Sequence, residues 1–485
     1  MNKELRRISV VTLAMFLALF VSTSVIQVFA VDDLRADPRN VRTLYASYSA
    51  ERGPILVDGR PIAESVEAPE SVFEFLRVYP EPTLYAPVTG YFTLNQGNTG
   101  IEGAYNDFLT GTANEQFLDQ LGALVTGQRP RGAAVELTID PVVQQAAREA
   151  LGDLKGAVIA IEPATGRILA MVSTPTFDPN RLSAHSTASV IEAYDQLLAD
   201  PDDPLINRTI SGDQYFPGST FKVLVAAAAI DSGRFTADSA FPNPATLPLP
   251  QSQSVITNAT RGPCGGGETV TIATALRLSC NIPFAELGLA LGEDTLADYA
   301  ERFGFGAQLE VPMAVTPSRF PRDLDDAQLM LSSFGQFDVR VTPLQMAMVN
   351  AAIANGGNLM QPTLLERIIA PDLSIIEQPE PVLLGQPVSR TTAETVTRLM
   401  VDAVANGVAG NATIEGVDVA GKTGTAENGG DAPFTLWFTG FAPADDPRVA
   451  VAVVIEDGGG LGQSGSSNQI AAPIGKRVLE AVLSR

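Results

Sequence analysis

The sequence predicts an α/β fold in which strands from both ends of one large region form a single sheet, with helices between them. A buried run at 157–161 and its return strand at 168–172 have the pattern of a hairpin. Near the C-terminus, 436–441 and 448–455 are again strand-like, and a helix is expected over 470–483. Strands at both termini with helices between them indicate one sheet to which both termini contribute.

The 485 residues are enough for two or three domains. The part before the main region is mixed in composition and rich in turn signals. It includes a strand at 135–139, followed by a helix that Asp140 caps, Pro141 opens and Gly152 ends. The expected organisation is a cytoplasmic tip and anchor over 1–31, a smaller pedestal domain over 32–152 and a main domain over 153–485.

The N-terminus has the pattern of a membrane anchor. An uncharged, mostly apolar run covers 8–31, with Asp32 and Asp33 directly after it. The run is long enough to span a bilayer, and basic residues before it predict an N-terminus inside and the remainder outside. A cleaved signal peptide with a weak site at 28–30 is the alternative, and the length of the run favours the anchor. The basic residues are Lys3, Arg6 and Arg7.

The composition excludes several functions. The formal net charge of −23 argues against nucleic acid and anionic lipid as partners, because both would be repelled. His185 is the only histidine, so a His-based metal site lacks ligands and a Ser-His-Asp triad would need this residue. It lies in a polar stretch that predicts a surface loop. We expect neither a metal nor a cofactor.

The first motif with chemical meaning is Ser219-Thr220-Phe221-Lys222, after a Pro-Gly turn. The stretch 223–230 is apolar on all sides and predicts a buried helix with Ser219 and Lys222 on one face. A serine nucleophile needs a base, and a lysine becomes one when burial or a nearby cation lowers its pKa. The helix N-terminus also offers N–H groups to an oxyanion. The pair alone fits a serine N-cap and a surface lysine equally well.

A second motif, Ser279-Cys280-Asn281, follows a helical stretch. A hydroxyl and an amide two residues apart on a turn can relay a proton and hold a substrate carbonyl. Ser-x-Asn is a weak signal by itself. The segment 466–468 has the same pattern just before the final helix, where we interpret it as a cap or turn.

A third motif, Lys422-Thr423-Gly424-Thr425, predicts an edge strand whose small residues let a substrate backbone lie alongside. We expect Lys422 and the hydroxyls of Thr423 and Thr425 to face a carboxylate. A phosphate-binding loop is excluded because the upstream glycine stands at the wrong spacing. Lysine is scarce in this chain, so the presence of Lys222 and Lys422 inside motifs strengthens both motifs.

Cys264 and Cys280 are the two cysteines of the chain. An exported chain meets an oxidising compartment, so a disulfide is one interpretation, and two unpaired thiols are the other. A bridge would tie the glycine loop at 265–267 to the Ser279 turn and fix the serine. Closing a loop of that size would stabilise the fold by roughly 3 kcal/mol.

Taken together and in this order, Ser-x-x-Lys, Ser-x-Asn and Lys-Thr-Gly resemble the motif set of the serine penicillin-recognising enzymes. Further segments resemble the class B penicillin-binding proteins, and most of all the compact penicillin-binding protein A group. The resemblance covers nearly the whole chain. The further segments are 37–40, 52–56, 103–109, 137–140, 161–166 and 341–347.

The resemblance implies a serine β-lactamase/transpeptidase-like domain, with an antiparallel sheet flanked by helices and an all-helical subdomain, together with an N-terminal pedestal domain. It implies that Ser219 attacks the D-Ala-D-Ala carbonyl of a peptidoglycan stem peptide and that a second stem takes the acyl group. Lys222 would deprotonate Ser219. Ser279 would pass the proton to the leaving amine, and Asn281 would hold a substrate amide.

By the same resemblance, Lys422 and Thr423 would bind the terminal carboxylate, and the N–H groups of Ser219 and Thr425 would form an oxyanion hole. β-Lactams would acylate Ser219 as substrate mimics. The implied partners are lipid-linked or nascent glycan stem peptides, β-lactam antibiotics, the cytoplasmic membrane, a glycosyltransferase, and division or elongation proteins. The main domain would lie on the outer face of a cytoplasmic membrane spanned once.

Alternatives of other classes share these motifs. A D,D-carboxypeptidase differs only in using water as acceptor, and a serine β-lactamase would need a further group to activate the deacylating water. A non-catalytic β-lactam sensor would need further membrane helices to signal inward, and a purely structural scaffold would tolerate loss of the motifs. Two departures concern loop geometry near the site: Cys280 replaces a small hydroxyl or acidic residue, and Phe337 stands where a second glycine of Gly-Gln-Gly is expected.

Overall fold

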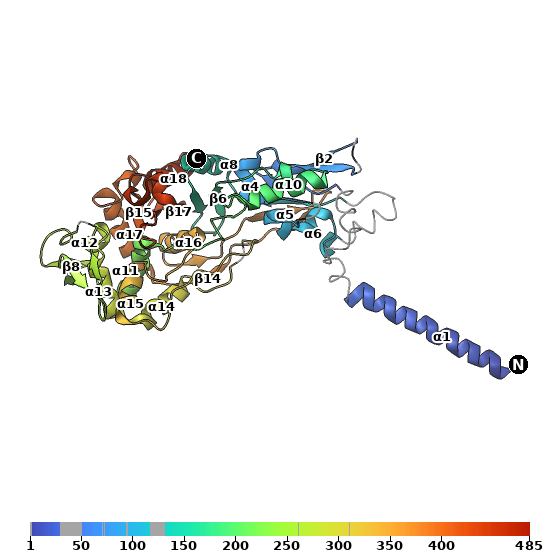
Figure 1. Ribbon diagram of the computed structural model, residues 1–485, viewed down its shortest axis with the longest axis horizontal. Coiled ribbons are helices and arrows are strands. Elements are labelled where there is room, and N and C mark those ends of the chain that lie inside the picture. Colours follow the sequence, from blue (N-terminus) through green and yellow to red (C-terminus); the bar gives the residue numbers. More distant parts are fainter. Residues whose placement is uncertain are drawn as a thin grey trace.

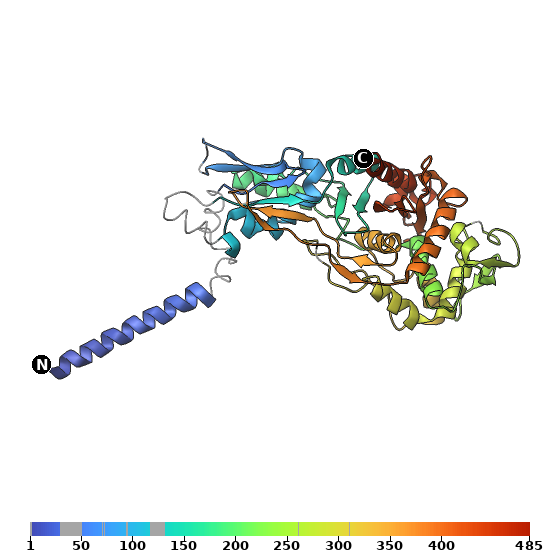
Figure 2. The same cartoon turned by 180° about the vertical axis from the view of Figure 1, so that it is seen from behind.

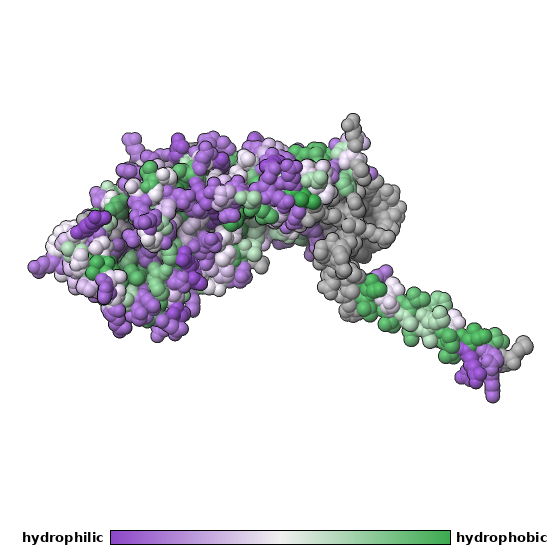
Figure 3. All heavy atoms as spheres, viewed as in Figure 1, coloured by the Kyte–Doolittle hydropathy of each residue, from purple (hydrophilic) through white to green (hydrophobic). Residues whose placement is uncertain are grey.

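Helix α1 (Asn2–Ser24), continued by the π-helical turn η1 (Val25–Phe29), stands apart from an elongated body in the computed structural model (Figure 1). The α1 surface is apolar along most of its length and hydrophilic near its N-terminal end (Figure 3). Within the described ranges, Lys3–Gln27 is the one helix long and apolar enough to cross a membrane. The structure describes residues 2–29, 51–69, 71, 73–93, 96–116, 131–259, 261–309 and 311–485.

Some predicted features lie outside these residues. They are the last residue of the alternative cleavage site (30), the end of the apolar run (30–31), the acidic pair 32–33 and the family-like segment 37–40. The described part of the chain is visible from both sides in Figures 1 and 2, with the pedestal between α1 and the main domain.

A five-stranded antiparallel sheet forms the centre of the main domain, in the order β15-β16-β17-β5-β6. Strand β17 pairs with β5, so the two ends of the region meet in one sheet as predicted. Every residue of β5 is buried, because successive side chains enter the cores on opposite faces. The strands are β5 (Gly156–Ile161), β6 (Ile168–Thr174), β15 (Ala420–Ala426), β16 (Thr435–Ala442) and β17 (Val449–Ile455).

Helices cover both faces of this sheet. α8 (Pro141–Leu151) and α18 (Ala471–Leu483) share one apolar core with it. The predicted cap of α8 is confirmed, because the Asp140 carboxylate accepts hydrogen bonds from the second and third helical N–H groups. The other face packs against α11 (Lys222–Asp231), α16 (Pro343–Ala354) and most of the apolar side of α17 (Arg390–Ala405).

A six-stranded sheet forms the pedestal, in the order β13-β12-β4-β1-β2-β3. Two of its strands come from far along the chain: β12 pairs with β4 and carries β13 at the edge. The pedestal and the main domain are therefore joined by a shared sheet, which the sequence pattern does not signal. The strands are β1 (Ile55–Val57), β2 (Arg60–Glu67), β3 (Phe75–Val78), β4 (Ala134–Leu137), β12 (Leu365–Ile369) and β13 (Ile375–Glu377).

The other described elements of this part of the chain are short helices and one separate strand pair. Asn180 on α9 accepts a hydrogen bond from the Tyr79 N–H and donates one to the Tyr79 carbonyl, which attaches this helical segment to the pedestal. The elements are α4 (Pro82–Thr89), α5 (Gly100–Ala104), α6 (Asn106–Thr110), α9 (Asn180–Ser183), α10 (Thr187–Leu198), β11 (Leu359–Met360) and β14 (Leu383–Gly385).

The subdomain expected to be all-helical also contains two short antiparallel strand pairs, β7 with β10 and β8 with β9. These pairs lie in the loops that lead from α11 to the Ser279 turn. The subdomain consists of α12 (Ile272–Arg277), α13 (Ile282–Leu291), α14 (Glu293–Arg302), α15 (Asp326–Ser332), β7 (Ala240–Pro242), β8 (Thr246–Pro248), β9 (Val255–Thr257) and β10 (Thr269–Thr271).

Candidate active site

Ser219 lies on a 3-10 turn (η3, Gly218–Phe221) that continues directly into α11. Its side chain is partly exposed, and its hydroxyl makes no hydrogen bond to any residue that the structure describes. The N-cap interpretation of Ser219 is therefore wrong. Gly218 has a φ of +52°, and a Cβ there would lie 2.8 Å from the Thr425 carbonyl oxygen. The turn and strand β15 are thus in close contact, and glycine is needed for that approach.

Lys222 is completely buried, so the surface-lysine interpretation is also wrong. Its Nζ donates to the Ser279 carbonyl at 2.8 Å and to Asn281 Oδ1 at 2.7 Å. The rings of Phe284 and Phe334 flank the ammonium, with centroids 5.6 and 5.8 Å from Nζ. The structure therefore brings the base candidate of the first motif against both polar residues of the second.

Lys422 lies on β15, which is an edge strand as predicted, and is also completely buried. Its Nζ donates to Ser279 Oγ at 2.7 Å and to the Thr423 carbonyl at 2.8 Å. Burial lowers the pKa of Lys422 to about 7. Burial, and secondarily the charge of Lys422, lower the pKa of Lys222 well below its ordinary value. A neutral lysine amine is thereby available near neutral pH, as a base for Ser219 requires.

The Ser279 turn is held in an unusual backbone conformation. Ser279 has a φ of +60°, in the left-handed region that favours glycine. Because an ammonium only donates, Ser279 Oγ accepts from Lys422 and keeps its own proton for another acceptor. A serine in this state can pass a proton on. Asn281 is oriented at both ends of its amide: Oδ1 accepts from Lys222, and Nδ2 donates to the Thr257 carbonyl at 2.9 Å.

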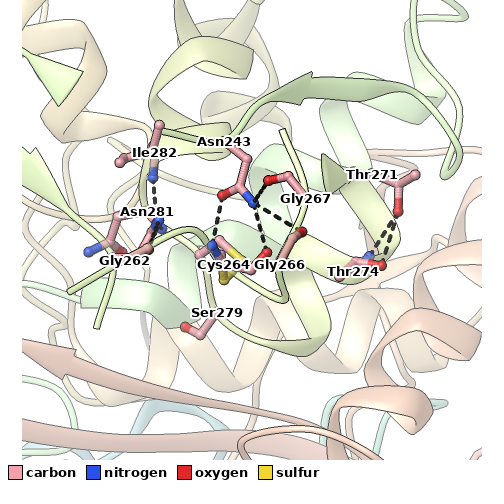
Figure 4. The surroundings of a disulfide bond; sticks show 12 residues. Asn243, Gly262, Cys264, Gly266, Gly267, Thr271, Thr274, Ser279, Asn281 and Ile282 are labelled. Atoms are coloured by element: carbon pink, nitrogen blue, oxygen red, sulfur yellow. Dashed lines mark hydrogen bonds between the residues drawn. A yellow bond between two sulfur atoms is a disulfide. The ribbon is translucent and has the colours of Figure 1, made fainter. Parts of the chain in front are cut away.

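Cys264 and Cys280 form a disulfide, so the paired interpretation applies. Asn243, which the sequence did not single out, clamps the other side of this bridge. Its Nδ2 donates to the Cys264 carbonyl at 2.9 Å, and its Oδ1 accepts from the Cys264 N–H at 2.8 Å. Figure 4 shows Asn243 also reaching the glycine loop, with Ser279 beside the bridge. The glycine loop and the Ser279 turn are therefore one connected unit.

A second unpredicted asparagine supports the other end of the motif. Asn258 is almost completely buried, and its Oδ1 accepts from the N–H groups of Asn281 at 2.9 Å and Ile282 at 3.1 Å. It acts as a cap for α13, whose first turn would otherwise have unpaired N–H groups. The signal for this role is absent from local sequence, because the cap comes from a loop 23 residues earlier.

Strand β15 lies directly on the Ser219 turn. A Cβ on Gly424 would be 2.9 Å from the Pro217 carbonyl oxygen and 3.0 Å from the Thr220 nitrogen. Strand alternation puts Lys422 on one face of β15 and the Thr423 and Thr425 side chains on the other. The three side chains expected to face one carboxylate are thus divided between two faces. A ligand can reach the exposed Thr425 without contacting Lys422.

The loop at 335–337, in which Phe337 stands where a glycine is expected, also contacts the Ser219 turn. Gly335 accepts a hydrogen bond from the Gly218 N–H at 2.9 Å. The Gln336 side-chain amide, with its oxygen toward the N–H, pairs with the backbone of Glu427 just beyond β15. Phe337 has a φ of +62° and is 40% exposed, so a bulky residue occupies a conformation in which glycine would be relaxed.

The segment 466–468 is a turn as predicted, but it also contributes to the site. Ser467 is 4% exposed, and its Oγ donates to the Gly424 carbonyl at 2.6 Å. The same oxygen lies 2.8 Å from Thr425 Oγ1. Sequence reasoning missed this residue because the contact crosses from the turn before α18 to the edge strand.

His185 lies in the pedestal contact and not near Ser219. Its ring nitrogens contact Ser71 Oγ and the Phe75 carbonyl, and its ring packs edge-on against Phe73. His185 lies in a loop as predicted, with its ring half-buried between two segments of the chain. It does not complete a triad with Ser219.

This fold and this arrangement of a serine, two buried lysines and a Ser-x-Asn turn define a penicillin-binding protein of the transpeptidase type. The family model described as the penicillin binding protein transpeptidase domain matches 156–480, and the penicillin binding protein A dimerisation domain matches 52–135. The chain belongs to this family, and to its class B.

Its relatives include the "Peptidoglycan D,D-transpeptidase PbpA" of Mycolicibacterium smegmatis, with 44% identity over 492 residues covering 100% of this chain and 99% of the relative. The fold is similar to that of penicillin-binding protein A from M. tuberculosis as a ceftriaxone acyl-enzyme complex, with a TM-score of 0.87, 41% identity and coverage of 90% of this chain and 100% of the other. The penicillin G acyl-enzyme complex of that protein gives a TM-score of 0.85 and 40% identity, with coverage of 90% and 100%.

Proposed function

We propose that the protein is a peptidoglycan D,D-transpeptidase that works through an acyl-enzyme at Ser219. The observation that carries the proposal is the convergence of two buried lysines on the Ser279 turn. One of them, Lys222, follows Ser219 by one helical turn, and the Ser219 hydroxyl makes no hydrogen bond to any described residue. Lys222 and Lys422 contact the carbonyl and the hydroxyl of the same residue. The family assignment and the β-lactam acyl-enzyme structures of similar proteins support it.

In the first half-reaction, Ser219 Oγ attacks the carbonyl carbon between the two terminal D-alanines, and its proton passes to neutral Lys222. The N–H groups of Ser219 and Thr425 bind the resulting oxyanion, which the close contact between the turn and β15 supports. The C–N bond then breaks. Ser279 delivers a proton to the leaving D-alanine amine and is reprotonated from the lysine pair.

In the second half-reaction, an amine of another stem peptide attacks the Ser219 ester. Ser279 and the lysine pair remove the amine proton, the new amide forms, and Ser219 recovers its hydroxyl proton. Asn281 holds a substrate amide. Thr423 and Thr425, which share one face of β15, bind the terminal carboxylate, and the positive charge of Lys422 on the opposite face attracts it. A β-lactam follows only the first half. Its C–N bond is part of a ring, so the amine leaving group stays attached to the acyl group and does not make way for the acceptor amine.

We further propose the placement of these parts in the cell. Residues 1–31 form a single-pass anchor with the N-terminus inside, 32–152 a pedestal and 153–485 the transpeptidase domain on the outer face of the cytoplasmic membrane. The apolar surface of α1 and the pedestal between it and the site support this arrangement (Figures 1 and 3). The substrates are stem peptides on lipid-linked or nascent glycan. A glycosyltransferase and division or elongation proteins are the proposed protein partners.

Product analysis tests the proposal against its alternatives. The wild-type protein and Ser219→Ala are incubated with a stem-peptide donor ending in D-Ala-D-Ala and an amine acceptor, and products are separated by mass. We expect D-alanine release and an acceptor-linked product from the wild type only. Release of D-alanine without linked product would indicate a carboxypeptidase, and rapid turnover of penicillin would indicate a β-lactamase. Ser464→Ala, an exposed serine outside the site, is the matched control.

A further inference from the structure

The only tryptophan of the chain lies on the face of the central sheet that carries the Ser219 turn. Trp437 is completely buried in β16, directly opposite Gly424 of β15. Cross-strand partners share one face of a sheet, so the indole lies beside the point where Gly424 meets the Ser219 turn. The indole Nε1 donates to the Phe216 carbonyl at 3.0 Å. Trp437 is therefore bonded to the chain just before the nucleophile.

The residue before Phe216 is held by contacts from distant segments. The Tyr215 N–H and carbonyl both bond to the backbone of Val341, at 3.0 and 2.9 Å. The Tyr215 hydroxyl donates to Glu456 Oε1 at 2.7 Å, and the ring packs edge-on against Trp437. These contacts fix Tyr215, and the indole N–H fixes the carbonyl that follows it along the chain.

The Phe216 carbonyl is one end of the backbone that directs the Ser219 N–H. The Pro217 ring restricts its own φ, which is −71°. At the next residue, the Gly218 N–H donates to the Gly335 carbonyl at 2.9 Å. With one anchor before Pro217 and one after it, the turn cannot tilt as a unit. The direction of the Ser219 N–H therefore depends on both anchors.

We propose that Trp437 is a positioning residue for the oxyanion hole of the reaction described above. Its indole N–H holds the Ser219 turn against β15, so that the N–H groups of Ser219 and Thr425 converge on one oxygen. Such donors stabilise a developing negative charge because they are already aimed at it, and a displaced turn weakens them. The inference rests on the proposed function and deepens it, because it names the group that aligns the two halves of the hole.

A single tryptophan allows the donor alone to be removed. Replacing Trp437 by β-benzothienylalanine puts a sulfur in place of the indole N–H and keeps the bicyclic ring. We expect acylation by benzylpenicillin to slow about two- to tenfold, as for the loss of one hydrogen bond. Fluorotryptophan at the same position keeps the N–H and is the matched control. Phe438→Leu, on the opposite face of the same strand, is the control for altered packing.

A second readout separates alignment of the hole from a general loss of structure. It is the ratio of the acylation rate constants of benzylpenicillin and of its analogue with C=S in place of the ring C=O. Sulfur is the weaker hydrogen-bond acceptor, so a misaligned hole slows the oxygen compound more than the sulfur compound. The ratio, oxygen over sulfur, should fall in the β-benzothienylalanine variant and stay at the wild-type value in both controls.

An unchanged rate with benzylpenicillin overturns the proposal. A slower rate with an unchanged ratio also overturns it, because a merely structural role would slow both compounds by the same factor. If the β-benzothienylalanine variant does not fold, Trp437→Phe removes the same N–H and must show the same fall in the ratio. Absence of acylation in the wild type would instead refute the proposed function at Ser219, so the two failures are distinguishable.

Discussion

Lys422 Nζ lies 2.7 Å from Ser279 Oγ, while Lys222 Nζ lies 2.8 Å from the carbonyl oxygen of the same residue. Ser279 therefore connects the two buried ammonium groups. The nearby charge of Lys422 adds to burial in lowering the pKa of Lys222, while burial lowers the pKa of Lys422 itself. Lys222, Ser279 and Lys422 thus form one coupled proton system.

This coupling predicts the pH dependence of acylation in Lys422→Met. The charge of Lys422 helps to lower the pKa of Lys222, so its removal should raise that pKa. The rate of acylation by a fluorescent penicillin rises with pH as Lys222 loses its proton. We expect this ascending limb to move to higher pH in the variant, whatever the change in maximal rate. Lys476→Met, a surface lysine, should leave the limb in place, and an unmoved limb in Lys422→Met would contradict the coupling.

Removal of the disulfide should affect both stability and the site. Cys264→Ala opens a bridge between residues 16 apart, which should lower the free energy of unfolding by roughly 3 kcal/mol. Acylation should also slow, because Ser279 loses a constraint that helps to hold its positive φ. Denaturant unfolding with and without reductant measures the first effect. Reductant should destabilise the wild type and leave the variant unchanged; equal effects on both would count against this role of the bridge.

The pedestal contains a buried charge cluster whose disruption should be costly. Glu102 is fully buried and accepts from Arg52 Nε and Arg77 Nε, both at 2.6 Å. Burial alone would raise the pKa of Glu102, but the two arginines outweigh it and lower the pKa. Glu102→Gln would leave two buried guanidinium groups without a counter-charge and should cost about 3–5 kcal/mol of stability.

An exposed ion pair provides the control for this cluster. Asp298 and Arg302 are about half exposed and one helical turn apart. Asp298→Asn should change the free energy of unfolding by no more than about 0.5 kcal/mol. Denaturant unfolding measures both variants. Similar losses of unfolding free energy in Asp298→Asn and Glu102→Gln would show that burial does not determine how much an ion pair stabilises this protein.

Replacing Phe337 by glycine should stabilise the protein. The residue has a φ of +62°, so Phe337→Gly removes the left-handed strain and should add about 1 kcal/mol, less the loss of a side chain that is 40% exposed. Phe337→Ala removes the same ring without relieving the backbone. Thermal unfolding should therefore rank glycine above alanine, and the reverse order would be evidence against strain at this position.

Local sequence patterns predicted the central sheet, the α8 cap, the final helix and the edge position of the Lys-Thr-Gly strand. These features depend on alternation, apolar runs and capping residues, all of which act over a few neighbours. The small residues of this strand predicted room for a substrate backbone, whereas the structure places the Ser219 turn against Gly424.

The missed features all depend on contacts between distant segments. Asn258 caps a helix from another loop, Asn243 clamps the disulfide, and Ser467 reaches β15 from the turn before α18. The joining of β12 to the pedestal sheet is of the same kind. Ser466-Ser467-Asn468 carried a visible pattern, but the pattern pointed to its first serine, whereas the buried contact is made by its second.

The most direct measurement of the central claim is the intact mass of the protein after exposure to benzylpenicillin, followed by peptide mapping of the adduct. We predict a single penicilloyl group on Ser219 in the wild type and none in Ser219→Ala. In Lys222→Ala, where the base is lost, the adduct should form about 10²–10⁴ times more slowly. An adduct on Ser219→Ala at the wild-type rate, or unchanged acylation in Lys222→Ala, would contradict the account.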